Sequence, residues 1–155
     1  MKRIILVSAA ILSTLISFNT LAQRMSPEEQ AEAAVETRQA VFKLLAFSMG
    51  PLQGMARGGD FDQAVAVQAL ERIQTLAPMI PEVFANDTTA YDFETRALNS
   101  IWSDMDGFSS AANDLAMGAA AAMNLITSQG ADGIRQAIQQ VGPTCGACHD
   151  AYRAE

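Results

Sequence analysis

The stretch LNSIWSDMDGFSSAANDLAMGAAAAMNLI, residues 98–126, decides the fold class of this chain. Apolar residues recur in it at alternating intervals of three and four over four heptads, which is the spacing of a helix with one apolar face. No part of the chain shows the period-two alternation that is typical of a strand. The sequence therefore predicts an all-α protein, with its clearest helix here. The apolar positions are Leu98, Ile101, Met105, Phe108, Ala112, Leu115, Ala119, Ala122 and Ile126.

A second periodic segment follows a short loop at residues 128–131 and runs nearly to the end of the chain. Gly142-Pro143 interrupts it, so we expect a bend there, with the helix restarting behind Pro143. Both cysteines of the chain fall on its apolar stripe, which predicts that they face the interior. The stripe consists of Ile134, Ala137, Ile138, Val141, Cys145, Cys148 and Tyr152.

The five residues Cys145-Gly146-Ala147-Cys148-His149 form the attachment signature of a c-type haem. Cysteines three apart share one face of a helix, so both thiols can add to the two vinyl groups along one haem edge. The next residue can then place its imidazole over the iron as an axial ligand. The chain contains two cysteines and one histidine, all in this motif. We predict one haem c, joined to Cys145 and Cys148, with His149 as the metal ligand.

Other interpretations of the cysteine pair stay open at this point. A redox-active pair normally begins a helix in a thioredoxin-like βαβ unit, and the strand pattern for such a unit is missing. A structural zinc needs four ligands, whereas the motif supplies at most three. A cofactor-free helical protein with a disulfide or free thiols would show no Soret absorption after purification.

The first 22 residues have the organisation of a secretory signal. Residues 1–3 are a short basic start, residues 4–16 are apolar apart from small hydroxyl residues, and small residues precede Gln23. An uncleaved membrane anchor is the alternative, but the apolar run is shorter than the roughly 20 residues of a spanning helix. We predict cleavage after Ala22, a single mature domain at residues 23–155, a periplasmic location and no membrane association after cleavage.

The charge of the chain excludes one class of partner and leaves another open. The chain has ten basic and seventeen acidic residues, for a net charge of −7. Removal of Lys2 and Arg3 with the signal makes the net charge −9. Such an acidic chain does not suit nucleic acid, whereas a basic redox partner remains possible. We also expect no enzyme, because one histidine held by iron leaves no general base for a catalytic triad.

Two further helices and a long connection precede residue 98. Ser26 to Glu29 form a capping box with proline at the first helical position, and Gly50-Pro51 should kink or end the helix that follows. Asp60 and Gln63 begin a second helix that runs to about residue 77, and residues 78–94 form the connection. Four helices with short first and third links predict an antiparallel four-helix bundle. The first helix has a core face of Val35, Arg38, Phe42, Leu45, Met49 and Leu52.

Antiparallel packing indicates which residues surround the haem. The end of the last helix should lie beside the early part of the first helix, the last turn of the second and the first half of the third. In a narrow bundle the wall of such a pocket is also the core. The predicted lining is Arg38, Gln39, Phe42, Leu76, Ile80, Ile101, Trp102, Met105 and Phe108.

These features resemble cytochrome c′, a class II c-type cytochrome with a four-helix bundle. The matching motifs are Thr37-Arg38-Gln39, Gly59-Asp60-Phe61-Asp62, Ile101-Trp102-Ser103-Asp104 and CGACHDAYR at residues 145–153. The resemblance implies a haem c on both cysteines, His149 as the fifth iron ligand and an empty sixth position. It also places Arg153 close to the proximal face.

The resemblance implies further roles on the other side of the haem. Arg38 and Gln39 match positions near the haem and its propionates, and Phe42 matches the apolar residue that closes the vacant side, where leucine is commoner. The family implies binding of nitric oxide and carbon monoxide with poor affinity for dioxygen, and a role in nitric oxide sequestration or electron transfer. It also implies a homodimer through the first two helices.

The residues themselves favour a vacant sixth position. Only Asp150 to Glu155 follow the motif, and they include no methionine. Residues 36–45 of the first helix contain neither methionine nor histidine. Met105 is the exception that can approach from the third helix, so a six-coordinate class II electron carrier is the alternative. An apolar pocket without donors would select small neutral diatomic gases.

The first helix carries a second apolar stripe beside its core face. Ala40, Val41, Leu44 and Phe47 lie at helical spacing and are expected to point away from the core. A contiguous apolar patch on one helix is typical of an interface, and a self-complementary patch favours a twofold pair. We therefore predict a homodimer with Leu44 and Phe47 near the centre of its interface.

Overall fold

The computed structural model describes residues 25–155, and the predicted signal sequence lies outside these described residues. Four long helices form an antiparallel bundle, which confirms the predicted fold class: α1 (Pro27–Ala56), α2 (Gln63–Leu76), α5 (Met105–Gln129) and α6 (Ile134–Tyr152). Two short helices, α3 (Met79–Val83) and α4 (Ser100–Ser103), lie in the connection between α2 and α5. A short 3₁₀ turn, η1 (Gly130–Gly133), joins α5 to α6.

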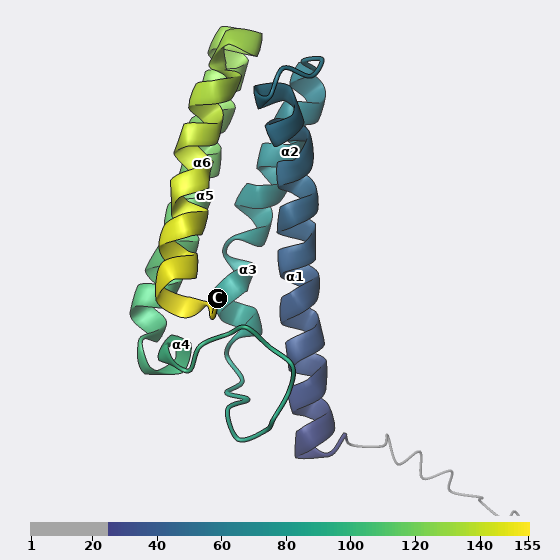
Figure 1. The fold of residues 1–155 in the computed structure, drawn as a ribbon, viewed down its shortest axis with the longest axis vertical. Coiled ribbons are helices and arrows are strands. Elements are labelled where there is room, and N and C mark those ends of the chain that lie inside the picture. Colours follow the sequence, from purple (N-terminus) through teal and green to yellow (C-terminus); the bar gives the residue numbers. More distant parts are fainter. Residues whose placement is uncertain (1–24) are drawn as a thin grey trace, which may run out of the picture.

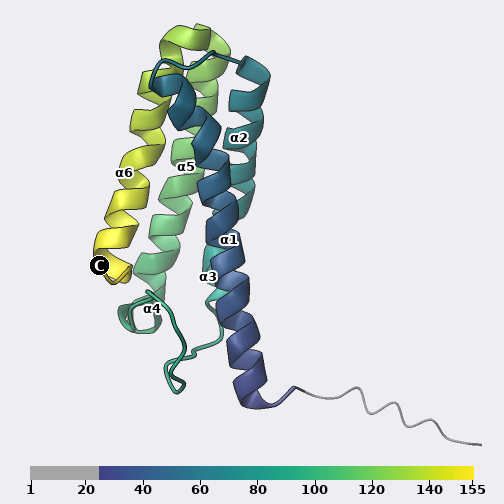
Figure 2. The same cartoon turned by 45° about the vertical axis from the view of Figure 1, so that its right-hand side comes forward.

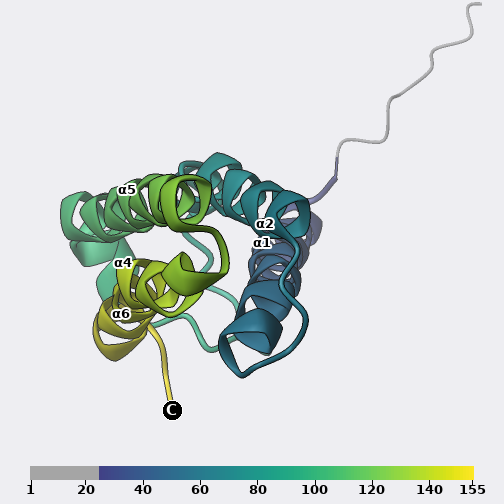
Figure 3. The same ribbon diagram turned by 90° about the horizontal axis from the view of Figure 1, so that it is seen from above.

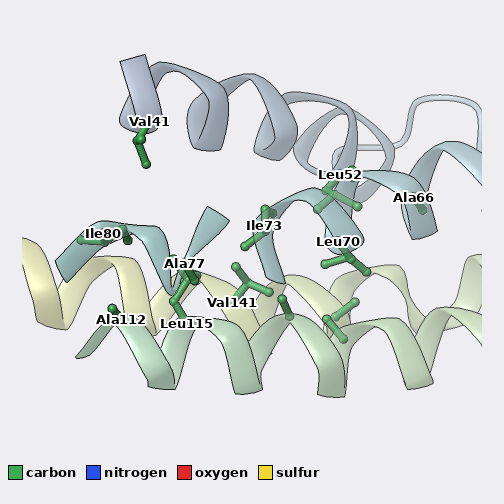
Figure 4. Packing of buried hydrophobic residues seen from close by; sticks show 14 of the residues in the cluster. Val41, Leu52, Ala66, Leu70, Ile73, Ala77, Ile80, Ala112, Leu115 and Val141 are labelled. Atoms are coloured by element: carbon green, nitrogen blue, oxygen red, sulfur yellow. The ribbon is translucent and has the colours of Figure 1, made fainter. Parts of the chain in front are cut away.

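The bundle consists of two helix pairs that meet around a shared core. Figures 1 and 3 show α1 beside α2 and α5 beside α6, and Figure 2 shows the connection between α3 and α4 passing under one end of the bundle. Apolar side chains from both pairs meet between them (Figure 4), including Leu52, Leu70, Ile73, Leu115 and Val141. None of the helices in residues 25–155 is long and apolar enough to cross a membrane.

Helix α1 begins as predicted, although its buried face differs from the expected one. The capping box at Ser26 is complete, since each of Ser26 and Glu29 donates a backbone N–H to the other's side chain. The prediction that Val41 points away from the core is wrong, because Val41 is buried whereas Phe42 is 37% exposed. Positions three and four after Arg38 flank the same helical face, and the smaller Val41 occupies its centre.

Helix α1 does not end at Gly50-Pro51 but continues to Ala56. A proline inside a helix removes one backbone hydrogen bond and costs about 3 kcal/mol. The next residue, Leu52, is fully buried in the core, and burial of a leucine recovers roughly 1.5–3 kcal/mol. The helix then closes at Gly58, whose φ of 100° suits only glycine.

The helix predicted over residues 98–126 is two helices separated at Asp104. Asp104 has φ −137° and ψ 53°, outside the helical region, and its carboxylate accepts the N–H of Gly107 at 3.2 Å as the cap of α5. Leu98 lies before α4 and is exposed, so it does not belong to the core stripe. The remaining positions of the stripe are buried from Ile101 to Ile126, apart from the half-buried Met105.

Helix α6 continues through Pro143, so the predicted restart behind this residue is wrong. The proline leaves the carbonyl group of Gln139 without its helical donor. Gln139 is exposed, so water can supply the missing donor. Val141, two residues before Pro143, is completely buried and holds this part of α6 against the core.

Candidate haem site

Cys145 and Cys148 lie on the inner side of α6, as the sequence predicts. Both side chains are half-buried against the core cluster and both thiols are free. They continue the stripe between the buried residues Val141 and Tyr152. His149 follows directly and is exposed. One helical turn thus brings together two thiols and one imidazole at the edge of the core.

The protonation of this turn argues against a redox-active cysteine pair. Burial raises the pKa of Cys145 and of Cys148, whereas a reactive pair needs a lowered pKa. Burial lowers the pKa of His149, and the charges of Arg153 and Arg96 lower it further against the opposing charge of Asp150. Residue 149 is therefore held toward its neutral form, which is the form that binds metals.

A structural zinc site also finds no support. Within residues 25–155, no group of three or more histidine, cysteine, aspartate or glutamate side chains is arranged to hold a metal ion. The donor set fits haem c instead, because two neutral thiols share one helical face and a neutral imidazole stands next to them.

Arg38 lies on α1 at the end of the bundle that carries His149. Its side chain is buried, and its guanidinium donates to the carbonyl group of Val83 at 3.0 Å, to the hydroxyl of Thr88 at 2.8 Å and to the carbonyl group of Asn86. Burial lowers its pKa, against the opposing charge of Asp87.

The neighbouring Gln39 is exposed, and its amide donates to the carbonyl group of Glu94 at 3.3 Å. Arg38 and Gln39 thus both bind the connection between α2 and α5. Their predicted role near the haem propionates stays a prediction.

Phe42 stands at the edge of an aromatic cluster. Its ring packs edge-on against Phe84, with centroids 6.2 Å apart. Phe84 is buried and also contacts Trp102 at 5.9 Å and Phe108 at 5.0 Å. Phe108 in turn contacts Tyr152 at 5.2 Å. The cluster therefore joins α1, the connection, α4, α5 and the last turn of α6.

The other predicted lining residues divide into three groups. Ile80, Ile101 and Phe108 are buried in the core. Trp102 and Met105 are half-buried against it, and the indole N–H of Trp102 donates to the carbonyl group of Phe84 at 2.9 Å. Leu76 is half-buried and does not belong to the core cluster. Phe84 was not predicted from the sequence, because it is one of three aromatic residues in the predicted connection, residues 78–94, and its spacing does not distinguish it.

The sequence analysis also missed how the end of α6 is held. Arg153 lies after the last helical residue, pairs with Ala97 in an isolated bridge, and has a guanidinium nitrogen 3.4 Å from Nδ1 of His149. The backbone N–H of Leu98 donates to the carbonyl group of Tyr152 at 3.0 Å. The hydroxyl of Tyr152 donates to Asp104 at 2.7 Å.

Fold and site together define a class of protein: a four-helix bundle with a haem attachment sequence in its last helix. The family model described as Cytochrome C' matches residues 33–153. The cytochrome c′ of Cereibacter sphaeroides is 36% identical over 129 residues, which cover 81% of this chain and 85% of that protein. The chain belongs to the cytochrome c′ family, whose members are haem proteins and not enzymes.

Solved structures agree with this assignment. Cytochrome c prime from Shewanella frigidimarina superposes with a TM-score of 0.72 at 31% identity, over 82% of this chain and 98% of that chain. The nitric oxide complex of a cytochrome c prime variant from Alcaligenes xylosoxidans gives a TM-score of 0.70 at 28% identity, over 81% and 97%. Other relatives bear the names cytochrome c-554 and cytochrome c-556, so the wider family is not limited to cytochromes c′.

Proposed function

We propose that this chain is an exported haem c protein whose iron has His149 as its single protein ligand and binds small gases, nitric oxide and carbon monoxide, or transfers electrons. One observation carries the proposal. Cys145 and Cys148 pack against a cluster of apolar and aromatic side chains that includes Val41 of α1, and residues 36–45 of α1 contain no methionine or histidine.

Each residue of the motif has one task in this proposal. Cys145 and Cys148 hold the haem through two thioether bonds, and His149 holds the iron. When bound, the haem supplies an iron that can take up a small ligand or change its oxidation state. Phe42 has no hydrogen-bond donor, and the donors of Trp102 and Tyr152 are already bound to Phe84 and Asp104, so charged and polar ligands would lose their hydration without replacement.

The absorption spectrum of the purified protein tests the coordination. We expect a Soret band, a high-spin ferric spectrum and a marked change when carbon monoxide is added to the reduced protein. A low-spin ferric spectrum with a methionine-to-iron charge-transfer band would contradict a single protein ligand. Absence of a Soret band would contradict haem attachment itself.

Nitric oxide is the gas for which a relative provides support. The solved structure of the Alcaligenes xylosoxidans variant is a nitric oxide complex, and the same fold is present here. Titration of the reduced protein with nitric oxide, followed by absorption and electron paramagnetic resonance, should show saturable binding. Binding of oxygen under the same conditions should be much weaker.

A six-coordinate electron carrier is the second candidate, and Met105 is the observation that favours it. Met105 begins α5 and is half-buried against the core at the same end of the bundle as His149. The substitution Met105→Leu keeps the volume and removes the sulfur. A change from low spin to high spin in this variant would establish the second candidate, whereas an unchanged high-spin spectrum supports the first.

The proposal includes a periplasmic location and a cleaved signal. The basic start and the short apolar run of residues 1–22 support export. Mass spectrometry of the protein isolated from the producing cells should give a mature chain that begins at Gln23, with the mass of one haem added. A chain that retains residues 1–22 would contradict this part of the proposal.

The proposed partners are small gases, a redox protein that is not identified here, and a second copy of the chain. Ala40, Leu44 and Phe47 support the homodimer because they are exposed on one side of α1. Phe47 is 65% exposed, and Arg72 of α2 lies over its ring at 5.8 Å. An interface centred on Leu44 and Phe47 would therefore also include α2. Val41, which is buried, does not take part.

A further inference from the structure

Residues 96–104 supply hydrogen bonds to the carbonyl groups at the end of α6. A helix leaves its final carbonyl groups without intrahelical donors, so its end frays unless other groups supply them. The hydroxyl of Ser100 donates to the carbonyl group of Ala151 at 3.1 Å, and the N–H of Leu98 donates to that of Tyr152 at 3.0 Å. The guanidinium of Arg96 donates to the carbonyl group of Ala154 at 2.8 and 3.0 Å.

Asp104 is the side chain of this segment that bonds to two helices. One of its carboxylate oxygens accepts the N–H of Gly107 at 3.2 Å and caps α5. The other oxygen accepts the phenol of Tyr152 at 2.7 Å. The same carboxylate therefore fixes the start of one helix and the end of another.

Gly107 leaves the space that this pair occupies. A Cβ atom at position 107 would collide with the carboxylate of Asp104 and with the hydroxyl oxygen of Tyr152. Glycine inside a helix is unfavourable by about 0.5–1 kcal/mol relative to alanine, so its presence in the first turn of α5 has a steric reason. The hydrogen-bonded pair Asp104 and Tyr152 therefore depends on the absence of a side chain at Gly107.

Tyr152 connects this pair to the haem-binding turn. It lies three residues after His149, on the buried stripe that includes Cys148, and its ring packs on Phe108. His149 itself is exposed, and its one side-chain hydrogen-bond partner in residues 25–155 is Arg153 at 3.4 Å, which is long for a hydrogen bond. The orientation of the imidazole therefore depends on the backbone of the turn that carries it.

We propose that Asp104 and Tyr152, joined by a hydrogen bond in the space left by Gly107, are positioning residues that hold the last turn of α6 and so set the orientation of the His149 imidazole toward the iron. This inference rests on the proposed function, because it assigns the axial ligand to His149.

Two substitutions remove the hydrogen bond between Asp104 and Tyr152, and one matched control leaves it in place. Tyr152→Phe keeps the ring and removes the hydroxyl. Asp104→Ser keeps a hydroxyl that can cap α5 but is too short to reach Tyr152 as well. Asp62→Ala removes the cap of α2, which accepts the N–H of Val65 at 3.1 Å at the opposite end of the bundle (Figure 1).

Two readouts on the haem-loaded protein separate positioning from general stability. The first is hydrogen exchange of the Arg153 amide, which donates to the carbonyl group of His149 at 3.1 Å. It should become about tenfold faster in Tyr152→Phe and Asp104→Ser, as expected for loss of one hydrogen bond. The second is the iron–histidine stretching band in resonance Raman spectra, which should shift or broaden in these two variants. Asp62→Ala should lower stability but leave both readouts unchanged.

The variants also test whether both residues act through one bond. The double variant Asp104→Ser with Tyr152→Phe should show no larger effect than either single variant, because the same interaction is already lost. Wild-type exchange and an unchanged stretching band in Tyr152→Phe would overturn the inference. A wild-type protein without covalent haem would instead refute the proposed function, and the exchange measurement would still test the anchoring of the turn.

Discussion

At the scale of single residues, Arg38 shows how a charged side chain serves the fold of this protein. Its guanidinium donates to two carbonyl groups and one hydroxyl of the connection and lies over the rings of Phe84 and Trp102, at 4.5 and 5.2 Å from their centroids. A buried cation is tolerated only when its donors are satisfied. The donors of Arg38 are satisfied by neutral acceptors, namely two carbonyl groups and one hydroxyl.

The substitution Arg38→Leu should therefore lower the free energy of unfolding by about 2–4 kcal/mol, because two carbonyl groups and a hydroxyl lose their donor. Arg72→Leu is the matched control, since Arg72 contacts the exposed ring of Phe47, and it should cost about 1 kcal/mol or less. Urea unfolding followed by circular dichroism measures both. Equal losses in the two variants would contradict the anchoring role of Arg38.

Phe42 is expected to control ligand entry, because a bulky ring beside the pocket must move before a diatomic gas can enter. Phe42→Ala should speed the association of carbon monoxide several-fold. Because the side chain is 37% exposed, its loss should cost about 1–3 kcal/mol, less than truncation of a fully buried phenylalanine. Phe47→Ala, on the same helix but more exposed, should leave association unchanged. Flash photolysis gives the rates, and identical kinetics in a folded Phe42→Ala variant would contradict a role of this residue in ligand entry.

We expect the free energy of unfolding to fall at alkaline pH, because the phenol of Tyr152 ionises there. Its hydrogen bond to Asp104 raises its pKa from 10.0 to about 12. A group whose pKa is higher in the folded state contributes its full stabilisation below the unfolded pKa and loses it as the pH rises through the folded pKa. The contribution should therefore be complete below pH 10.0 and disappear near pH 12. The chain has two tyrosines, so the difference in ultraviolet titration between wild type and Tyr152→Phe isolates this group. A transition at the ordinary pKa would contradict the hydrogen bond.

At the scale of elements, steric contact with neighbouring side chains, rather than helix propensity, decides which residue fits at position 107 in the first turn of α5. Gly107→Ala should lower the free energy of unfolding by about 1–3 kcal/mol, because the new methyl group displaces Asp104 or Tyr152. Gly54→Ala in α1 is the control, since a Cβ atom there meets nothing within 4 Å, and it should stabilise the protein by about 0.5–1 kcal/mol. Thermal unfolding of both variants gives the comparison. Stabilisation by Gly107→Ala would contradict the steric restriction at position 107.

The apolar stripes of α5 and α6 could be predicted because they depend on local spacing alone. Positions from Ile101 to Ile126 and from Ile134 to Tyr152 face the core as their periodicity indicates. The attachment motif could be found for the same reason, since its chemistry needs residues only three and four apart. Local patterns thus sufficed to predict the fold class and to find the candidate attachment motif.

Long-range contacts explain what the sequence did not reveal. Pro51 and Pro143 are strong local signals for a helix end, yet both helices continue, because Leu52 and Val141 are buried against other elements. The break at Asp104 depends on a phenol 48 positions further along the chain. Such partners cannot be identified from spacing, because they become neighbours only after the bundle has formed.

At the scale of the whole molecule, the connection between α2 and α5 links the two helix pairs at one end of the bundle. The early part of the connection between α2 and α5 binds Arg38 of α1, and its later part, residues 96–104, binds the end of α6. The aromatic cluster fills the space between them. The opposite side of α1 carries exposed apolar residues instead, and this is the surface to which a second copy is assigned.

Phe47→Glu should convert the proposed dimer to a monomer, because it places a charge at the centre of the interface. Met117→Glu is the matched control, since Met117 is similarly exposed, at 63%, but lies on α5. Sedimentation of the haem-loaded protein at micromolar concentration measures the outcome. A wild-type monomer, or a dimer that survives Phe47→Glu, counts against this interface.

The half-buried cysteines have a consequence for how the mature protein is made. Their sulfur atoms face the core, and the turn that carries them is closed by a segment some fifty residues earlier in the chain. Attachment of the proposed haem at both sulfur atoms would need access from the side on which they pack against the core. We therefore expect the proposed thioether bonds to form before the last helix is fully docked. Maturation would then be an ordered process in which covalent chemistry precedes the final packing of the bundle.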